Sequence, residues 1–341
     1  MHRPAVVVTG ATGFIAKHCI AALLRAGHPV RGTVRSLARG EDVVRALRRS
    51  GVETAGLSFA AADLEADEGW GEAMAGARHV LHVASPFPVE QPRDADEVIR
   101  PAREGALRVL RAATAAGVER VVLTSSTVAV MYGARKPDGA LYDEGDWTDV
   151  TRTDLTPYIL SKTLAERAAW DYVGATPGAP ELVAINPSFV QGPALDPDLS
   201  TSLEVIRFMG KGMYPLSPRI AFPICDVRDV AAAHAAAMTK PGISGRRFVV
   251  ASGNLPLIEL GRQMVAELPD LKSKAPKAEM PDWAVRSLAL FDRRLRSVLP
   301  ELGAERVVSN RALREDLGIE PRDASAAVRA AARSLRDLKV I

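Results

Sequence analysis

A tyrosine and a lysine four residues apart form the first pair of side chains in this sequence that could carry out chemistry. Tyr158 and Lys162 lie in a segment with helical spacing, so they share one face of the helix. A phenol has a pKa of about 10, and an ammonium group within about 4–6 Å lowers it by roughly 1–3 units. The pair could therefore act as a general acid or base. The spacing is common, so the assignment depends on other residues.

A serine at the end of a predicted strand could act beside this pair. The apolar strand expected over residues 120–125 ends in hydroxyl groups, and Ser126 precedes Tyr158 by 32 residues. Ligands of open parallel sheets bind at the carboxyl ends of the strands. A hydroxyl there can donate a hydrogen bond to a carbonyl oxygen, although strand-end hydroxyls more often bond the loop backbone.

A glycine-containing turn near the N-terminus predicts a phosphate site. Val6 to Val8 indicate a strand, Gly10 and Gly13 a turn, and Phe14 the start of a helix. Gly10 permits the tight turn, and Gly13 lets the backbone approach a pyrophosphate. Free N–H groups and the helix dipole attract the phosphate charge. The third position is Ala16, which is small enough for the helix to pack on the strand.

Arginines after the second predicted strand indicate the cofactor. An acid at this position usually holds the ribose hydroxyls of NAD, whereas an arginine fits the 2′-phosphate of NADP. The segment offers Arg35, Ser36 and Arg39, and the first acid of the chain is Glu41. A hydrogen bond from a guanidinium to a phosphate is worth roughly 1.5–3 kcal/mol. The sequence therefore predicts NADP (NADPH) as the cofactor.

Composition excludes several classes of protein. The 341 residues are 47% hydrophobic and 25% charged, as in ordinary globular proteins, which excludes a disordered or fibrous chain. The net charge of +3 is concentrated in the first 40 residues, which hold six bases and no acid. No apolar run reaches the roughly 18 residues of a membrane span. With two distant cysteines and no signal-peptide pattern, we expect a cytoplasmic protein without nucleic-acid or membrane partners.

Strand and helix patterns alternate along most of the chain. Such alternation, with apolar strands, predicts an α/β fold with a doubly wound parallel Rossmann sheet and a smaller C-terminal substrate lobe. We expect the NADP-binding domain over residues 1–190, with about 220–255, and the substrate-binding lobe over about 191–219 and 256–341. The expected strands are 5–9, 29–35, 57–61, 79–84, 120–125, 181–186 and 247–251, and the expected helices are 14–26, 41–49, 95–116, 157–173, 202–209, 226–238, 257–267 and 324–338.

Together these motifs resemble a known family. The glycine turn, Ser126, the Tyr158/Lys162 pair and the segment 186–193 occur in the order typical of the extended short-chain dehydrogenases/reductases, which include the NAD-dependent epimerase/dehydratase family. The resemblance covers residues 5–193, extends to 226–230 and fades after about 255. More narrowly, four segments resemble the dihydroflavonol-4-reductase-like branch of aldehyde and ketone reductases: 33–35 (TVR), 82–86 (HVASP), 142–147 (YDEGDW) and 161–166 (SKTLAE).

The resemblance implies a role for each matching residue. Tyr158 would donate a proton to the carbonyl oxygen, Lys162 would lower the pKa of Tyr158 and bind the nicotinamide ribose, and Ser126 would polarise the carbonyl. The implied cofactor-binding residues are Gly10, Thr12, Gly13, Phe14, Ile15, Arg35, Ser36, Arg39, Asp63, Leu64, Val83, Ala84, Ser85, Thr124, Ser125, Tyr158, Lys162, Pro187 and Ser188.

One position departs from the plant relatives. Five residues after Ser126, plant dihydroflavonol reductases often carry a polar residue that contacts the flavonoid, and this chain has Met131. An apolar side chain there favours a smaller or more hydrophobic carbonyl substrate. The candidate pocket walls are Phe87, Met131, Phe189 and Met213, each of which could equally be a core residue.

Three functions remain open. The favoured one is an NADPH-dependent reductase of aldehyde or ketone carbonyls. A sugar-nucleotide epimerase or dehydratase of the same fold usually keeps NAD, which Arg35 disfavours. A non-catalytic NADP-binding regulator has no need of the Tyr158/Lys162 pair. The expected partners are a small carbonyl substrate and at most a second copy of the chain as a homodimer, and no metal is expected.

Overall fold

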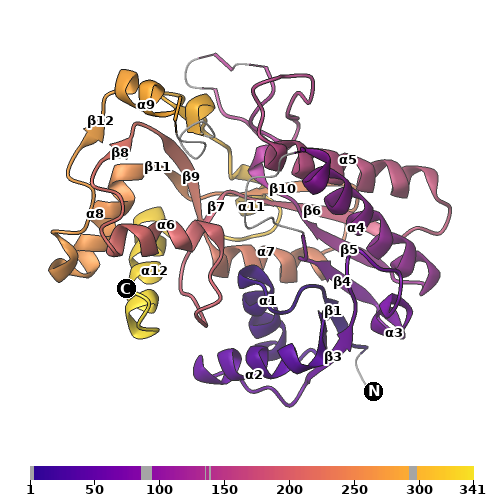
Figure 1. The fold of residues 1–341 in the computed structure, drawn as a ribbon. Helices are drawn as coiled ribbons and strands as arrows, with labels where there is room; N and C mark the ends of the chain where they lie inside the picture. Colours follow the sequence, from indigo (N-terminus) through magenta and orange to yellow (C-terminus); the bar gives the residue numbers. More distant parts are fainter. Residues whose placement is uncertain (1–3, 86–93, 135, 138–139, 292–297) are drawn as a thin grey trace.

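The computed structural model describes residues 4–85, 94–134, 136–137, 140–291 and 298–341. In Figure 1 a large sheet with helices on both faces occupies the right and lower parts of the view. A group of smaller sheets and helices, coloured from rose to yellow, lies on the left.

The central sheet has seven strands in the order β10-β6-β5-β4-β1-β2-β3, and every neighbouring pair is parallel. This arrangement confirms the predicted doubly wound α/β fold. All seven carboxyl ends therefore meet at one edge. The strands are β1 (Val6–Val8), β2 (Val30–Val34), β3 (Leu57–Ala61), β4 (His79–His82), β5 (Arg120–Thr124), β6 (Glu181–Pro187) and β10 (Arg247–Val250).

Helices cover both faces of this sheet. On one face α1 (Phe14–Arg25) packs against α7 (Val227–Thr239) and α2 (Gly40–Arg49). On the other face α4 (Asp96–Ala115) packs against α5 (Pro157–Ala175), with α3 (Trp70–Met74) beside α4. The inner strands β1, β4, β5 and β6 are buried on both faces, which explains why most of their residues are apolar.

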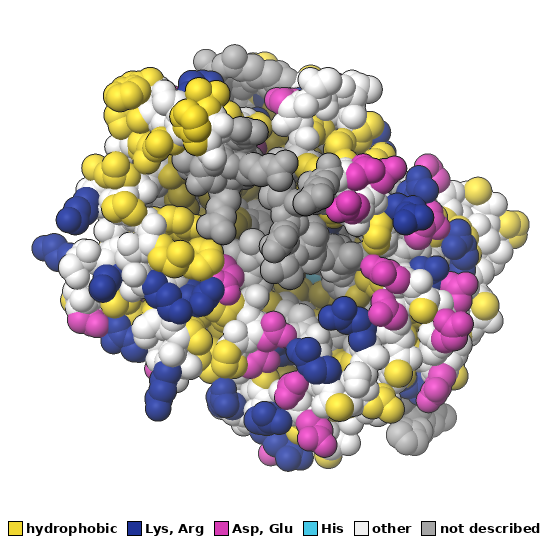
Figure 2. Space-filling view, in the orientation of Figure 1, with side chains coloured by type: hydrophobic (Ala, Val, Ile, Leu, Met, Phe, Trp, Pro, Cys, Tyr) yellow, Lys and Arg dark blue, Asp and Glu magenta, His cyan; other side chains and the backbone are white. Residues whose placement is uncertain are grey.

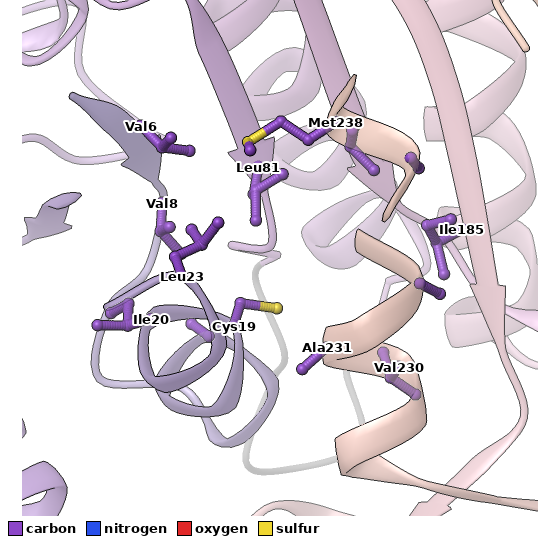
Figure 3. Close-up of a cluster of buried hydrophobic side chains, with 14 of the residues drawn as sticks. Val6, Val8, Cys19, Ile20, Leu23, Leu81, Ile185, Val230, Ala231 and Met238 are labelled. Atoms are coloured by element: carbon purple, nitrogen blue, oxygen red, sulfur yellow. The ribbon is translucent and has the colours of Figure 1, made fainter. Parts of the chain in front are cut away.

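Successive residues of strand β1 pack into the hydrophobic cores on the two faces of the central sheet. Val6 and Val8 join the cluster that includes Cys19, Leu81 and Met238, as Figure 3 shows, whereas Val7 joins the cluster on the other face. Successive strand side chains point to opposite faces, so a run of three valines supplies both cores.

The second part of the chain is built on two small sheets. One has the order β11-β9-β7, with β11 antiparallel to β9, and the other pairs β12 with β8. The buried side chains of Ile206, Leu260 and Val328, from three different helices, belong to a separate core cluster, to which α1 contributes Phe14. The elements are β7 (Phe189–Gln191), α6 (Thr201–Gly210), β8 (Ser217–Pro218), β9 (Ala221–Asp226), β11 (Gly253–Pro256), α8 (Leu257–Glu267), β12 (Glu279–Met280), α9 (Asp282–Leu288) and α12 (Ala324–Asp337).

Several elements differ from the sequence prediction. The short strands β7, β8, β9, β11 and β12 and the helix α3 were not predicted, whereas α9 lies in the stretch 269–300, where the sequence indicates short helical pieces. Helix α11 (Arg311–Glu315) packs on β10, and its Leu313 belongs to the core of the central sheet. The chain thus returns to that sheet after residue 256, and the division into a cofactor domain and a substrate lobe stays a prediction. The 3₁₀ turns are η1 (Leu37–Arg39), η2 (Thr127–Ala129), η3 (Pro269–Leu271) and η4 (Leu299–Glu301).

The surface carries mixed charge. Figure 2 shows basic and acidic side chains interspersed on the face it presents, with apolar side chains gathered at the upper left, where Figure 1 shows α9. Trp283 in α9 and Phe291 after it are 71% and 90% exposed. Among the helices of the described ranges, none is long and apolar enough to cross a bilayer.

The core assignment of α1 can be tested by truncating Leu23, whose side chain is 1% exposed. We expect Leu23→Ala to lower the free energy of unfolding by about 2–5 kcal/mol, because it leaves a cavity. The matched control is Leu37→Ala, at a leucine 58% exposed, which should cost less than about 0.5 kcal/mol. Urea unfolding followed by tryptophan fluorescence measures both values, and equal losses would contradict the assignment.

Candidate functional site

The glycine turn joins β1 to α1 at the carboxyl edge of the sheet. Gly10 adopts a left-handed φ of 66°, and a Cβ atom there would lie 2.9 Å from the Cβ of Ala84. The turn is fixed on β2, because the amide of Gly10 donates to Thr33 Oγ1 at 3.1 Å and the amide of Ala11 to the carbonyl of Thr33 at 2.9 Å. Gly13 precedes α1 without a side-chain cap. The first amides of the helix are therefore available to an anion.

Thr9 ties this turn to the end of β4. Its Oγ1 accepts hydrogen bonds from the amides of Val83 at 3.0 Å and Ala84 at 2.9 Å. Both lone pairs are then used, so the Thr9 hydroxyl donates to His82 Nδ1 at 2.8 Å. Burial, with a smaller effect from the Lys162 charge, lowers the pKa of His82 to about 3. His82 is therefore neutral and acts as a fixed link between the turn and the loop that follows β4.

The basic residues of the first 40 positions have different partners. Arg31 donates to the carbonyls of Ala73 and Ala75 at 2.9 and 2.8 Å, and thereby caps α3. Lys17, only 2% exposed, pairs with Asp196. Arg35 is exposed and has no hydrogen-bond or ion-pair partner among the described residues. Of these three, only Arg35 presents an uncommitted cation next to the turn.

Arg39 is held by two acids. Its Nε lies 3.1 Å from Asp42 Oδ2, and its Nη2 lies 3.1 Å from Asp198 Oδ2. A cavity of ≈ 160 Å³ lies here, with Thr12, Arg39, Asp42, Asp196 and Asp198 among its lining residues. The segment after β7 thus reaches across the first turn of α1. Ser36 is exposed beside Arg35.

The structure brings Ser126 and Tyr158 together. Tyr158 stands in the first turn of α5, which Thr156 caps by accepting from the amide of Ile159 at 3.4 Å. The Ser126 side chain lies within hydrogen-bonding reach of Tyr158, and its Oγ also accepts from the amide of Val128 at 3.3 Å and lies 3.5 Å from the carbonyl oxygen of Pro187. Burial raises the pKa of Tyr158, and the hydrogen bond with Ser126 acts in the opposite direction. The lowering that we expected from Lys162 is therefore not what the structure shows.

Lys162 follows one turn later on α5. Burial lowers the pKa of its ammonium to about 8, and the nearby carboxylate of Glu166 acts to raise it. The ammonium group donates no hydrogen bond to any described residue. Its donors are therefore available to a bound molecule.

Two hydroxyl groups that we predicted to contact the cofactor form hydrogen bonds within the protein. Thr124 Oγ1 lies 2.7 Å from His234 Nε2, and His234 Nδ1 lies 2.8 Å from the carbonyl of Val230, so Thr124 donates toward α7. Ser125 Oγ donates to Glu166 Oε2 at 2.5 Å. Each of these two hydroxyl groups donates its hydrogen to a buried side chain.

The remaining predicted residues lie in three places. Asp63 and Leu64 follow β3, where Asp63 Oδ1 accepts from the amide of Glu65 at 3.1 Å. Pro187 ends β6, and the amide of Ser188 donates to Val250 at 3.0 Å. Phe14 and Ile15 open α1, and Ser85 follows the amides held by Thr9.

The three candidate pocket walls that the structure describes lie in different surroundings. Met131 is 5% exposed, in a buried cluster with Tyr132 and Ile159, whereas Met213 is 54% exposed after α6. Phe189 stacks on Phe222 with ring centroids 4.9 Å apart, in the other core. Phe87 lies outside the described residues.

Several residues of the site were not found from the sequence. Thr9 and His82 are 73 positions apart, and Glu166 and Arg247 are 81 apart, so no local spacing reveals either pair. For Glu166 one signal was available: a charged residue one turn beyond Lys162 on a helix that must pack on the sheet. Within the described ranges, no three His, Cys, Asp or Glu side chains gather as a metal site.

The described residues fit a phosphorylated dinucleotide. The uncapped start of α1 and the uncommitted Arg35 supply anion donors at one end. At the other end, the ammonium group of Lys162 has donors that no described residue accepts. The close approach of Gly10 to Ala84 leaves no room for a side chain in the turn between them.

The chain is similar to several known reductases. The chain is 34% identical over 306 residues to "Ketoreductase azaE" of Aspergillus niger, covering 84% of this chain and 89% of the relative. It is 40% identical over 211 residues to dihydroflavonol 4-reductase of Hordeum vulgare, covering 59% and 58%. The crystal structure of yeast methylglyoxal/isovaleraldehyde reductase Gre2, complexed with NADPH, matches with a TM-score of 0.79 and 27% identity, covering 99% of this chain and 100% of that chain.

The family match covers most of the chain. Residues 6–251 match the NAD dependent epimerase/dehydratase family, from β1 to the end of β10, and so include the glycine turn and α5. The fold and the order of the motifs point to the same group. The chain therefore belongs to the NAD-dependent epimerase/dehydratase family, within the extended short-chain dehydrogenases/reductases.

Proposed function

We propose that this protein is an NADPH-dependent reductase of aldehyde or ketone carbonyls, in which Tyr158 donates the proton. The observation that carries the proposal is the pair of Ser126 and Tyr158 side chains, within hydrogen-bonding reach of each other and one helical turn from the Lys162 ammonium. The pair stands at the same sheet edge as the glycine turn. Named reductases among the relatives, and a structural neighbour complexed with NADPH, support the same function.

The cofactor would lie along this edge. The start of α1 would hold the pyrophosphate, and Arg35 and Ser36 would hold the 2′-phosphate. Arg39 would contribute only if its guanidinium turned from Asp42 or Asp198. Lys162, with no hydrogen bond to a described residue, would bind the nicotinamide ribose. NADPH, when bound, supplies the hydride.

Three residues of the chain then polarise and protonate the carbonyl oxygen of the substrate. Ser126 donates a hydrogen bond to it, which polarises the carbonyl and sets its position beside the phenol. Tyr158 transfers its proton as negative charge develops on the oxygen. The Lys162 ammonium stabilises the phenolate that remains. We propose that the smaller sheets and helices after β7 form the substrate side of the site.

The role of Tyr158 can be tested by removing its hydroxyl. We expect Tyr158→Phe to lower kcat for NADPH oxidation with a panel of aromatic and aliphatic aldehydes and ketones by at least about 10²-fold, because the proton donor is lost. The Kd for NADPH, measured by fluorescence titration, should change by less than about threefold. Wild-type protein that oxidises no NADPH with any member of the panel would refute the proposed reduction.

Cofactor choice can be tested at Arg35. Arg35→Asp replaces an uncommitted cation with a charge that repels the 2′-phosphate, so the Kd for NADPH should rise by at least about tenfold. NADH lacks that phosphate, and its Kd should change little. Arg31→Lys is the matched control, because Arg31 caps α3 instead of facing the turn. Equal weakening of NADPH and NADH by Arg35→Asp would remove Arg35 from the phosphate site.

The pH dependence follows from Lys162. Its ammonium, with a pKa of about 8, is charged below that pH and loses its proton above it. The pKa of Tyr158 is raised, so the phenol stays protonated and able to donate over the same range. We therefore expect kcat/KM for reduction to fall as the pH rises through about 8. Initial rates between about pH 6 and pH 10 measure this, and an unchanged kcat/KM up to pH 10 would contradict it.

A further inference from the structure

A buried carboxylate lies directly behind the proposed reaction centre. Glu166 is 1% exposed, and one of its oxygens accepts from Ser125 Oγ at 2.5 Å and from Asn186 Nδ2 at 2.9 Å. The other oxygen accepts from Arg247 Nε at 2.6 Å and from Trp170 Nε1 at 3.2 Å. Arg247 Nη2 also donates to the first oxygen at 3.3 Å, so four side chains donate five hydrogen bonds to this one carboxylate.

Arg247 is itself enclosed. This side chain of β10 is 7% exposed, and its guanidinium lies 3.8 Å from the centroid of the Trp147 ring. It also donates to the carbonyl of Glu144 at 3.0 Å and of Asp146 at 2.6 Å. The Glu166–Arg247 pair thus joins α5, β10 and the loop containing residues 144–147.

This pair adjoins two parts of the reaction centre. Glu166 stands one helical turn after Lys162, on the helix that also carries Tyr158. Asn186 donates to Glu166 and, at 3.1 Å, to the carbonyl of Ser126. Ser125, which precedes Ser126, is tied to the same carboxylate. Moving Glu166 would therefore disturb both the charge beside Lys162 and the strand end that carries Ser126.

Stability alone does not explain such a pair. Replacing a buried ion pair with well-packed apolar side chains is often neutral or stabilising, because desolvating two charges costs as much as they gain from each other. Because the Glu166–Arg247 pair lies behind the proposed catalytic residues, we infer that it has a role in the reaction.

We propose that Glu166 is a positioning residue, whose buried carboxylate keeps the Lys162 ammonium charged and fixes the Ser125–Ser126 strand end, while Arg247 holds that carboxylate in place. The role in the reaction rests on the proposed function. The effect on the charge of Lys162 does not depend on it.

Of the residues that the structure describes, the other groups around Lys162 supply no negative charge. On α5 the phenol of Tyr158 has a raised pKa and is neutral, and from β4 His82 has a pKa of about 3 and is also neutral. Ser126 contributes an uncharged hydroxyl. Arg247 lies behind Glu166 and is positive, and Asp146, whose carbonyl Arg247 contacts, pairs its carboxylate with Lys136 at 2.8 Å. Glu166 is thus the carboxylate whose charge acts on Lys162.

The test compares two variants that change the charge in opposite directions. Glu166→Gln removes the carboxylate and leaves Arg247, so the pKa of Lys162 should fall by about one unit or more. Arg247→Met leaves Glu166 with three of its hydrogen-bond donors and no guanidinium, so the pKa of Lys162 should rise. NMR titration of protein carrying labelled lysine measures both, with the signal assigned by its loss in Lys162→Arg.

A purely structural role makes a different prediction. Loosened packing would admit water and raise the pKa of Lys162 in both variants toward that of a hydrated lysine. A rise in Glu166→Gln, or no shift in it, would therefore overturn the proposal. Trp170→Phe is the matched control, because it removes one hydrogen bond to Glu166 and no charge, and the pKa of Lys162 should stay within about 0.3 units of its wild-type value.

Two further measurements distinguish a failure of this proposal from a failure to fold and from a failure of the proposed function. If Glu166→Gln alone does not fold, the double variant Glu166→Gln/Arg247→Met removes both charges, and the pKa of Lys162 should still lie below the wild-type value. In each variant the decline of kcat/KM at high pH should move with the NMR pKa. If the pKa of Lys162 shifts in opposite directions in the two variants but the wild-type protein reduces no carbonyl compound, the proposed function is refuted and the effect of Glu166 on Lys162 stands. If the protein reduces carbonyl compounds but the pKa of Lys162 does not shift in this way, only the role of Glu166 is refuted.

Discussion

The parallel pairing of the seven-stranded sheet is the constraint on which the rest of the structure depends. Because every strand runs the same way, the carboxyl ends of β1, β2, β4, β5 and β6 reach one edge. Each end carries a polar group that the loop or helix after it must satisfy. Residues scattered over nearly 190 positions are thereby placed along a single line, with the phosphate end at the glycine turn and the reaction end at α5.

Most polar groups at that edge are already bonded within the protein. The hydroxyl groups of Thr9, Thr124 and Ser125 donate hydrogen bonds to the buried side chains of His82, His234 and Glu166, respectively. They fix the loops in place. By contrast, Arg35 and Lys162 donate no hydrogen bond to a described residue, and we propose that they bind the cofactor. Of the basic side chains described in the first 40 residues, Lys17, Arg25, Arg31 and Arg39 have partners within the protein, which leaves Arg35 beside the turn.

The sequence predicted the central sheet because its strands are apolar on both faces and its helices are long. Val6–Val8 and Leu57–Ala61 were found from pattern alone. The short strands β7, β9 and β11 were missed, since strands of three to six residues among prolines and glycines have too few positions to show a period. Tyr158 and Lys162 were found by their spacing within one helix. The Glu166–Arg247 contact depends on β10 lying beside β6, which only the topology provides.

The central claim is that hydride passes from the cofactor to a carbonyl carbon while Tyr158 supplies the proton. The most direct measurement uses NADPH deuterated at both C4 positions, with mass spectrometry of the product formed from an aldehyde. The account predicts an alcohol with one deuterium on the carbinol carbon. An alcohol without deuterium, or no alcohol together with epimerisation of a sugar nucleotide and no net oxidation of the cofactor, would contradict it.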